Sequence, residues 1–333
     1  MMWIWYVVTG PFALLFAVAV WLRNWMFDHG WRRVKRLDKP VISVGNLAMG
    51  GTGKTPVCVS LLRILVQMGY QPALLSRGYG RRLPKRALRV TQESHWLDVG
   101  DEPLMIARSV PQAFVAVGPT RWDAAMTLSD HPVDVFVVDD GFQHRQLARD
   151  LDILLWDVTQ KKPTIFPWGK FREGLSGLRR ADLVVFTRSD GVPVRLAEIV
   201  KQVNPSATCV SVGFRPGVFR TTLGDPLDLR PGTPVGAFAG IAFPDRFFEQ
   251  LRRQGFELID PLGLGDHKPL TLAQFRSLCE TARTRQLPAV ITTYKDAVKL
   301  EHPTESDIVI GFQELETHWE DEERLRQFLL KYL

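Results

Sequence analysis

The sequence predicts an α/β protein of two units, a larger one built on a mostly parallel sheet and a smaller one that follows it. Short apolar runs alternate with stretches of helical spacing along most of the 333 residues, a pattern typical of strands separated by helices. A glycine-rich loop follows the first apolar run. Residues 214–234 are dense in proline and glycine, and they separate the strands and helices of the first unit from those of the second. The length allows two domains with separate cores.

The composition is that of a globular protein. The chain is 45% hydrophobic and 23% charged, which argues against general disorder. Its net charge of +6 favours an anionic partner, such as a nucleic acid, a lipid surface or a phosphorylated substrate. The cysteines Cys58, Cys209 and Cys279 form no CxxC pair, so neither a disulfide framework nor a zinc cluster is expected, and a reducing compartment fits.

Residues 1–26 are predicted to form a membrane-associated helix. No charged residue occurs from Met1 to Leu22, a length that can cross a bilayer or lie in one leaflet, and Gly10 and Pro11 leave both arrangements open. Basic residues follow from Arg23 onward and would keep the remainder of the chain cytoplasmic. A signal peptide lacks support because no basic residue precedes the apolar run, and a core helix is usually shorter.

The larger unit is expected over residues 27–213 and the smaller over 235–333, with 214–234 as a linker or a small hairpin between them. In the larger unit a helix is predicted over 55–68. Its strands are predicted at 40–44, 73–75, 113–117, 133–138, 152–155, 183–187 and 208–212. The smaller unit should contain strands at 235–239, 257–259, 289–293 and 308–310, and helices at 244–253 and 272–284.

The strongest motif is a phosphate-binding loop between the first strand and the first helix. Its glycines expose backbone N–H groups to phosphate oxygens, Lys54 can bridge the β- and γ-phosphates, and Thr55 can ligate Mg²⁺. The predicted nucleotide-binding residues are Ala48, Met49, Gly50, Gly51, Thr52, Gly53, Lys54 and Thr55. The strict pattern has glycine in place of Ala48, and cargo-partitioning ATPases have lysine in place of Met49.

A second apolar run ends in two carboxylates, Asp139 and Asp140. In proteins with a phosphate-binding loop, such a strand lies in the same sheet and its terminal aspartate holds Mg²⁺ directly or through water. Alone, an aspartate pair after a strand is more often a turn or a helix cap. Behind this loop it predicts a metal site, without separating the roles of the two aspartates.

Further short motifs follow in order along the chain. They are Ser76-Arg77-Gly78-Tyr79-Gly80-Arg81, Gly100-Asp101-Glu102-Pro103, Asp139-Asp140-Gly141-Phe142-Gln143-His144, Arg172-Glu173 and Gly265-Asp266-His267. The chain resembles the tetraacyldisaccharide 4′-kinases, also called lipid A 4′-kinases, over nearly its whole length. The resemblance rests on these motifs, the apolar N-terminus and the Gly-Gly-Thr-Gly-Lys-Thr-Pro loop.

The resemblance implies ATP- and Mg²⁺-dependent phosphorylation of the 4′-hydroxyl of a tetraacylated disaccharide 1-phosphate, giving lipid IVA. It also implies two α/β/α units joined by a short β-linker, with the active site between them. The expected partners are this lipid and an anionic membrane surface. No nucleic-acid module is recognisable, and no protein partner is evident.

The resemblance also assigns roles to single residues. Asp101 matches the family's catalytic aspartate and His267 its histidine partner, while Arg121, with Lys54, would stabilise charge on the transferring group. Without the resemblance, Asp101 could be a helix cap and Arg121 an exposed residue at a helix start. Glu173 would help Thr55, Asp139 and Asp140 hold Mg²⁺, and the substrate-binding candidates are Tyr79, Arg81, Gln143 and His144. The bulky Phe166–Gly169 stretch before Arg172 departs from the family pattern.

Two other functions fit a nucleotide-binding loop beside a membrane. One is a GTPase or transport ATPase, although Thr187-Arg188-Ser189-Asp190 lacks the asparagine and lysine that read guanine. The other is a nucleotide-gated scaffold, which would bind ATP without phosphorylating an acceptor.

Overall fold

The computed structural model describes residues 2–160, 163–266, 268–300 and 307–333. In this part of the chain one twelve-stranded sheet has the order β10-β9-β11-β12-β8-β7-β6-β1-β5-β2-β4-β3. Its strands are β1 (Val41–Asn46), β2 (Pro72–Ser76), β3 (Leu88–Val90), β4 (Phe114–Val117), β5 (Val135–Asp139), β6 (Leu151–Asp157), β7 (Leu183–Thr187), β8 (Thr208–Thr221), β9 (Pro234–Ala239), β10 (Glu257–Gly263), β11 (Val290–Thr293) and β12 (Ile310–Trp319). Among the twelve strands of the described residues, only β3–β4 and β8–β12 pair antiparallel, so the predicted, mostly parallel α/β sheet is confirmed.

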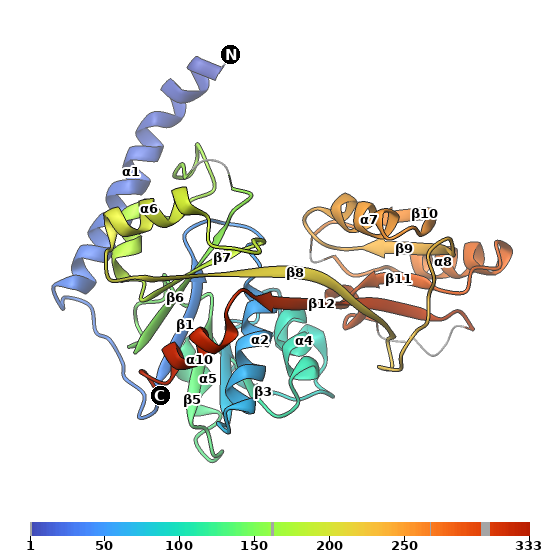
Figure 1. Ribbon diagram of the computed structural model, residues 1–333, viewed down its shortest axis with the longest axis horizontal. Coiled ribbons are helices and arrows are strands. Elements are labelled where there is room, and N and C mark those ends of the chain that lie inside the picture. The colour runs from blue at the N-terminus through green and yellow to red at the C-terminus, as the bar shows by residue number, and fades with distance from the viewer. Residues whose placement is uncertain (1, 161–162, 267, 301–306) are drawn as a thin grey trace.

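Helices lie on both sides of this sheet, and α1 projects away from it (Figure 1). They are α1 (Met2–Asp28), α2 (Lys54–Gln67), α3 (Trp96–Val99), α4 (Asp101–Ser109), α5 (Arg121–Met126), the 3₁₀ helix η1 (Leu175–Arg180), α6 (Val194–Val203), α7 (Pro244–Arg253), α8 (Leu272–Thr284), α9 (Tyr294–Ala297) and α10 (Glu322–Leu329).

The central strands of the first unit, β1, β2, β5, β6 and β7, are buried on both faces. Along β5, Val135 and Val137 face the core that includes α2 and α4, whereas Phe136 and Val138 face the core beneath α5. This alternation follows the two-residue period of a strand, and burial on both faces explains the continuous apolar runs of the sequence. The second unit repeats the arrangement, because α7 packs on one face of β9 and α8 on the other.

The two units are joined by β8 and β12, which pair antiparallel from Val212 opposite Trp319 to Thr221 opposite Gly311. The predicted boundary between residues 213 and 214 therefore lies inside β8. Helix α10 then returns to the first unit, where Leu325 and Leu329 are buried in the same core as α2. Residues 235–333 thus do not all pack with the second unit.

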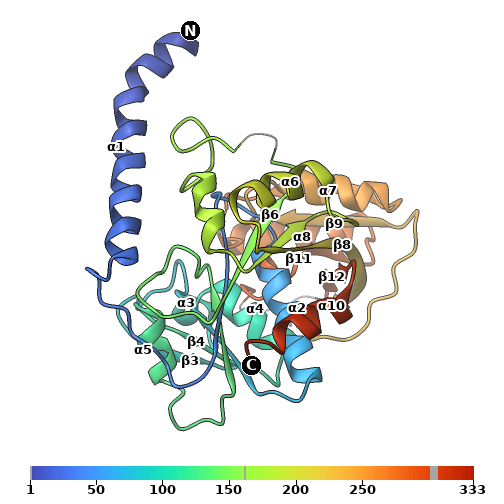
Figure 2. The same cartoon turned by 60° about the vertical axis from the view of Figure 1, so that its left-hand side comes forward.

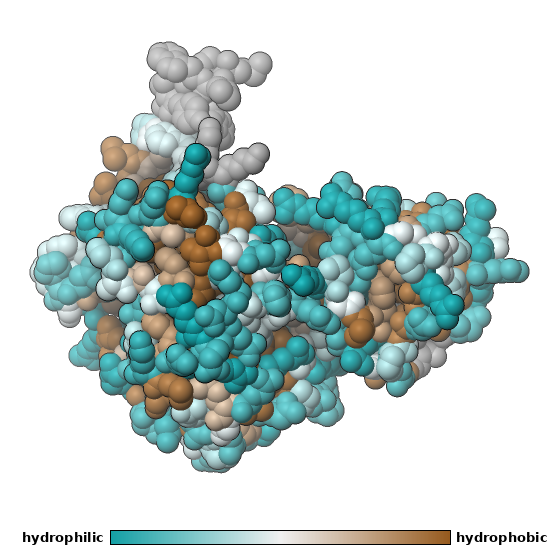
Figure 3. All heavy atoms as spheres, viewed as in Figure 1, coloured by the Kyte–Doolittle hydropathy of each residue, from teal (hydrophilic) through white to brown (hydrophobic). Residues whose placement is uncertain are grey.

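Helix α1 is continuous through Pro11 and projects from the first unit (Figures 1 and 2). Its side chains Phe12, Leu14, Leu15 and Trp21 are exposed. By length and composition, Thr9–Asp28 could cross a membrane. Figure 3 shows hydrophobic residues beside the projecting helix and hydrophilic residues over most of the remaining visible face. Membrane attachment remains a prediction.

Candidate active site

The predicted nucleotide-binding residues lie in one loop between β1 and α2. Gly50 and Gly53 have positive φ angles of 105° and 85°, a conformation that favours glycine. A Cβ on Gly53 would also lie 2.5 Å from the Phe214 ring. The loop therefore needs glycine at these positions for its backbone path, and it directs the N-terminus of the fourteen-residue α2 toward any phosphate it holds.

Hydrogen bonds from neighbouring elements fix this loop. The buried Thr52 accepts from Asn46 Nδ2 at 2.7 Å, and its carbonyl accepts from Thr187 Oγ1 at 2.9 Å. On the other side, Met49 N donates to the Lys170 carbonyl at 2.6 Å. A loop held in this way keeps its N–H groups in place before a phosphate arrives.

Asp139 and Asp140, at the end of β5, differ in environment. Asp139 is buried and accepts from Ser76 Oγ at 3.0 Å. Burial and the negative charges of Glu102 and Asp140 raise the pKa of Asp139 to about 6. Asp140 lies 2.9 Å from Arg172 Nη1 and 3.5 Å from Lys54 Nζ. Burial opposes its ionisation, but these cations outweigh burial and lower the pKa of Asp140.

Arg121 lies inside the protein and not on the surface. Its Nη2 donates to the Asp139 carbonyl at 2.7 Å, and only 5% of the residue is exposed. Burial lowers the pKa of its guanidinium, although Asp139 and Asp140 oppose that shift. Thr120 caps α5 through a reciprocal pair of hydrogen bonds with Asp123, and this cap fixes the helix start that carries Arg121.

Asp101 begins α4 and is also buried, with 5% of its surface exposed. It follows Gly100, whose φ is 95° and at which a Cβ would lie 3.2 Å from the Cα of Gly78. This close approach of two glycine turns places the start of α4 beside the Arg77–Arg81 segment. Its predicted partner His267 lies outside the described residues.

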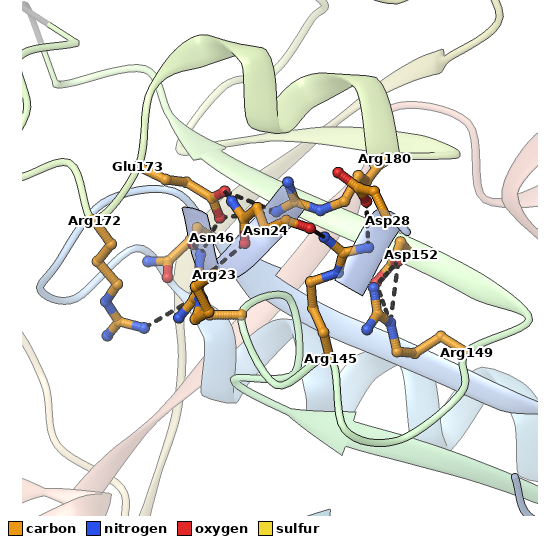
Figure 4. Close-up of polar contacts among 11 residues, drawn as sticks. Arg23, Asn24, Asp28, Asn46, Arg145, Arg149, Asp152, Arg172, Glu173 and Arg180 are labelled. Atoms are coloured by element: carbon orange, nitrogen blue, oxygen red, sulfur yellow. Dashed lines mark hydrogen bonds and ion pairs between the residues drawn. The ribbon is translucent and has the colours of Figure 1, made fainter. Parts of the chain in front are cut away.

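Glu173 has partners other than those predicted (Figure 4). Its carboxylate accepts from Arg180 Nη2 at 2.9 Å, from Gln143 Nε2 at 3.0 Å and from Asn24 Nδ2 of α1 at 3.0 Å. The structure therefore connects Glu173 to the end of α1, and among the described residues no hydrogen bond joins it to Thr55. Neither Asn24 nor Arg180 stands out in the sequence, because their importance depends on the docking of α1.

The four predicted substrate-binding residues have different surroundings. Tyr79 is 75% exposed, whereas Arg81 is buried and donates to the carbonyls of Pro84 and Arg86 in its own loop. Gln143 Nε2 donates to the Asn46 carbonyl at 2.7 Å. Burial, with the charges of nearby arginines, lowers the pKa of His144 to about 4, so its imidazole is neutral at pH 7. Arg81 thus has a structural task that its sequence position does not reveal.

A pocket of about 430 Å³ lies between α1 and the segment around η1. Phe16, Val20 and Trp21 of α1 provide apolar walls. The charged lining residues are three arginines and two carboxylates: Arg172, Arg179, Arg180, Asp28 and Glu173. The pocket therefore combines an apolar side with a side that carries arginines. One of these, Arg172, forms an ion pair with Asp140, so the pocket borders the phosphate-binding region.

A family model described as tetraacyldisaccharide-1-P 4′-kinase matches residues 5–333. The chain belongs to this family. A tetraacyldisaccharide 4′-kinase from Geobacter metallireducens is 40% identical over 296 residues, and the matched segment covers 86% of this chain and 86% of the relative. Another from Aeromonas hydrophila is 35% identical over 310 residues, which cover 89% of this chain and 86% of the relative.

A solved structure supports the same assignment. It is the "apo" form of LpxK from Aquifex aeolicus in complex with ATP, and it matches with a TM-score of 0.77 and 26% identity over 98% of both chains. The resemblance found in the sequence is confirmed. This member of the tetraacyldisaccharide 4′-kinase family is an enzyme, a kinase of lipid A biosynthesis.

Proposed function

We propose that this kinase transfers the γ-phosphoryl group of ATP to the 4′-hydroxyl of tetraacyldisaccharide 1-phosphate at the cytoplasmic face of the inner membrane. The observation that carries the proposal is the convergence of Lys54, Arg121 and the Asp139–Asp140 pair at one edge of the sheet. The names of the curated relatives and the ATP in the similar solved structure support this substrate pair.

Residues 48–55 would bind the phosphates of ATP through backbone N–H groups, with Lys54 on the β- and γ-phosphates. Thr55 and the Asp139–Asp140 pair would hold Mg²⁺, which would neutralise charge on those phosphates. These oxygen donors suit a hard cation, and the raised pKa of Asp139 reflects a buried carboxylate that lacks enough nearby positive charge. Glu173 is better assigned to the docking of α1, because Arg180, Gln143 and Asn24 already bind it.

Asp101 would accept the proton of the attacking hydroxyl, with His267 as its partner. A sugar hydroxyl is a weak nucleophile at neutral pH, so a positioned base is needed. Arg121 would act on the developing charge from beside Asp139, and its burial strengthens that interaction.

The lipid would lie in the pocket beside α1. Its acyl chains suit the apolar wall of Phe16, Val20 and Trp21, and its sugar and phosphate groups suit the arginine side. Tyr79, Gln143 and His144 remain candidates for contacts with the sugar. Helix α1 would then both attach the enzyme to an anionic membrane and form part of the binding site.

The decisive experiment follows labelled γ-phosphate from ATP to tetraacyldisaccharide 1-phosphate in detergent. The wild type should label the lipid, whereas Asp101→Ala should lower kcat by about 100-fold or more while it still binds ATP. Lys54→Ala supplies the inactive reference, because it removes a phosphate contact. Label from both wild type and Asp101→Ala would place the base elsewhere. A folded, ATP-binding wild type that leaves the lipid unlabelled would refute the substrate assignment.

A further inference from the structure

The second unit places a cation beside the proposed catalytic base. Helix α9 packs on α4, and Lys295 Nζ lies 3.1 Å from Glu102 Oε1. Glu102 directly follows Asp101 in the first turn of α4, and its backbone N–H donates to Asp101 Oδ1 at 2.8 Å. One ion pair therefore joins the two units next to the carboxylate that would accept the proton.

The second unit holds Lys295 on a rigid turn. The neighbouring Asp296 is 2% exposed and accepts from Gly240 N at 2.8 Å and from Thr293 Oγ1 at 2.6 Å. Lys299 Nζ lies 2.6 Å from the same carboxylate. On the other side, Tyr294 stacks on Phe312 of β12 with ring centroids 4.2 Å apart. Because these contacts fix α9, the position of Lys295 follows the position of the second unit.

Acidic groups crowd this region. Glu102 and Asp101 lie on α4, Asp139 at the end of β5 and Asp266 after β10. Burial opposes the charge of Lys295, but Glu102, Asp101 and Asp266 outweigh burial and raise the pKa of the ammonium group. Glu102 in turn raises the pKa of Asp139. Without a cation here, a negative Glu102 would favour a protonated, inactive Asp101.

We infer that Lys295 is a positioning residue of this kinase, which offsets the charge of Glu102 and keeps Asp101 ionised when the second unit lies against α4. The inference rests on the proposed role of Asp101 as the base. It adds a physical reason why the base would be ready only in this arrangement of the two units: the cation that keeps it ionised comes from the other unit.

The test compares Lys295→Met with Lys295→Arg over a range of pH, using labelled phosphate transfer to the lipid. Lys295→Met should move the acidic limb of the kcat/KM profile upward by about one pH unit, and should lower kcat/KM by about tenfold at pH values below the midpoint of that limb. Lys295→Arg keeps the charge and should restore most of the activity and the wild-type limb. Lys201→Met, an exposed lysine on α6, is the matched control and should change neither.

Two outcomes would overturn the inference. In the first, Lys295→Met retains wild-type activity over the whole pH range. In the second, Lys295→Met loses activity and thermal stability while the acidic limb stays in place, which would show that Lys295 only stabilises the contact between the two units. Transfer by the wild type in the same assay tests the proposed function separately. If that transfer fails, ¹³C-carboxyl NMR can still test the role of Lys295, with Asp101→Asn used to assign the Asp101 signal. The pKa of Asp101 should be higher in Lys295→Met than in Lys295→Arg.

Discussion

The buried carboxylate of Asp139 lowers the stability of the fold, although the active site would use it to bind Mg²⁺. Its burial and two acidic neighbours raise its pKa to about 6 from an ordinary 3.8. Between these values the unfolded chain releases a proton that the folded protein retains, so the contribution of Asp139 to stability falls as pH rises. Well above pH 6 this loss of stability no longer changes with pH. A pKa raised from 3.8 to about 6 corresponds to about 3 kcal/mol in the free energy of unfolding.

Asp139→Asn should therefore stabilise the protein in the absence of Mg²⁺ and nucleotide. The amide oxygen can still accept from Ser76, so the packing is preserved. We expect the free energy of unfolding to rise by about 1–3 kcal/mol at pH 7.5, with little change below about pH 3, where the Asp139 carboxyl group is protonated in both the folded and the unfolded state. Urea unfolding at the two pH values measures this. An equal effect at both would show that charge burial is not the cause.

At the scale of elements, residues 164–173 connect parts that are distant in sequence. Phe171 pairs with Ala48 of the phosphate-binding loop, and Lys170 Nζ lies over the Phe243 ring of the second unit, 5.4 Å from its centroid. Trp168 Nε1 donates to Thr9 Oγ1 of α1 at 2.8 Å, and Phe166 packs edge-on against Phe16. The bulky residues that depart from the family pattern are thus the ones that hold α1.

Deleting residues 1–23 should weaken binding to vesicles of anionic lipid, because it removes the exposed apolar side chains of α1. This variant retains Asn24, the residue of α1 that donates to Glu173. A finer comparison uses Leu15→Asp and Leu223→Asp, since these leucines are 67% and 70% exposed but only Leu15 lies on α1. Vesicle sedimentation should show loss for Leu15→Asp alone. Equal binding by all variants would place the membrane contact elsewhere.

Most elements could be predicted because their signals are local. Helices α7 and α8 have the bounds that the apolar spacing predicts, and the two-sided burial of β5 gives a continuous apolar run. The outer parts of β8 and β12 were not predicted, because Pro216 and Gly217 disfavour a strand locally and pairing with β12 stabilises it. The same limit applies to the site, because the hydrogen bond from Asn24 to Glu173 depends on the docking of α1 and no local signal in the sequence indicates it.

The whole molecule depends on the return of α10 to the first unit. Trp319 Nε1 donates to Ser60 Oγ of α2 at 2.9 Å, and Leu325 is fully buried against the same core. We expect Leu325→Ala to lower the free energy of unfolding by about 2–4 kcal/mol. Leu330→Ala, at a residue that is 57% exposed, should change it by less than about 0.5 kcal/mol. Thermal or urea unfolding tests the pair, and similar small effects would contradict the role of α10 in this core.

The position of α10 also affects how the protein can fold during its synthesis. The ribosome makes α2 early but makes α10 only after the whole second unit, so one apolar face of α2 lacks its cover for most of translation. A nascent chain in that state exposes hydrophobic surface, a condition in which chaperones bind. The phosphate-binding unit, although most of its residues are made first, can complete its core only after the unit that follows it.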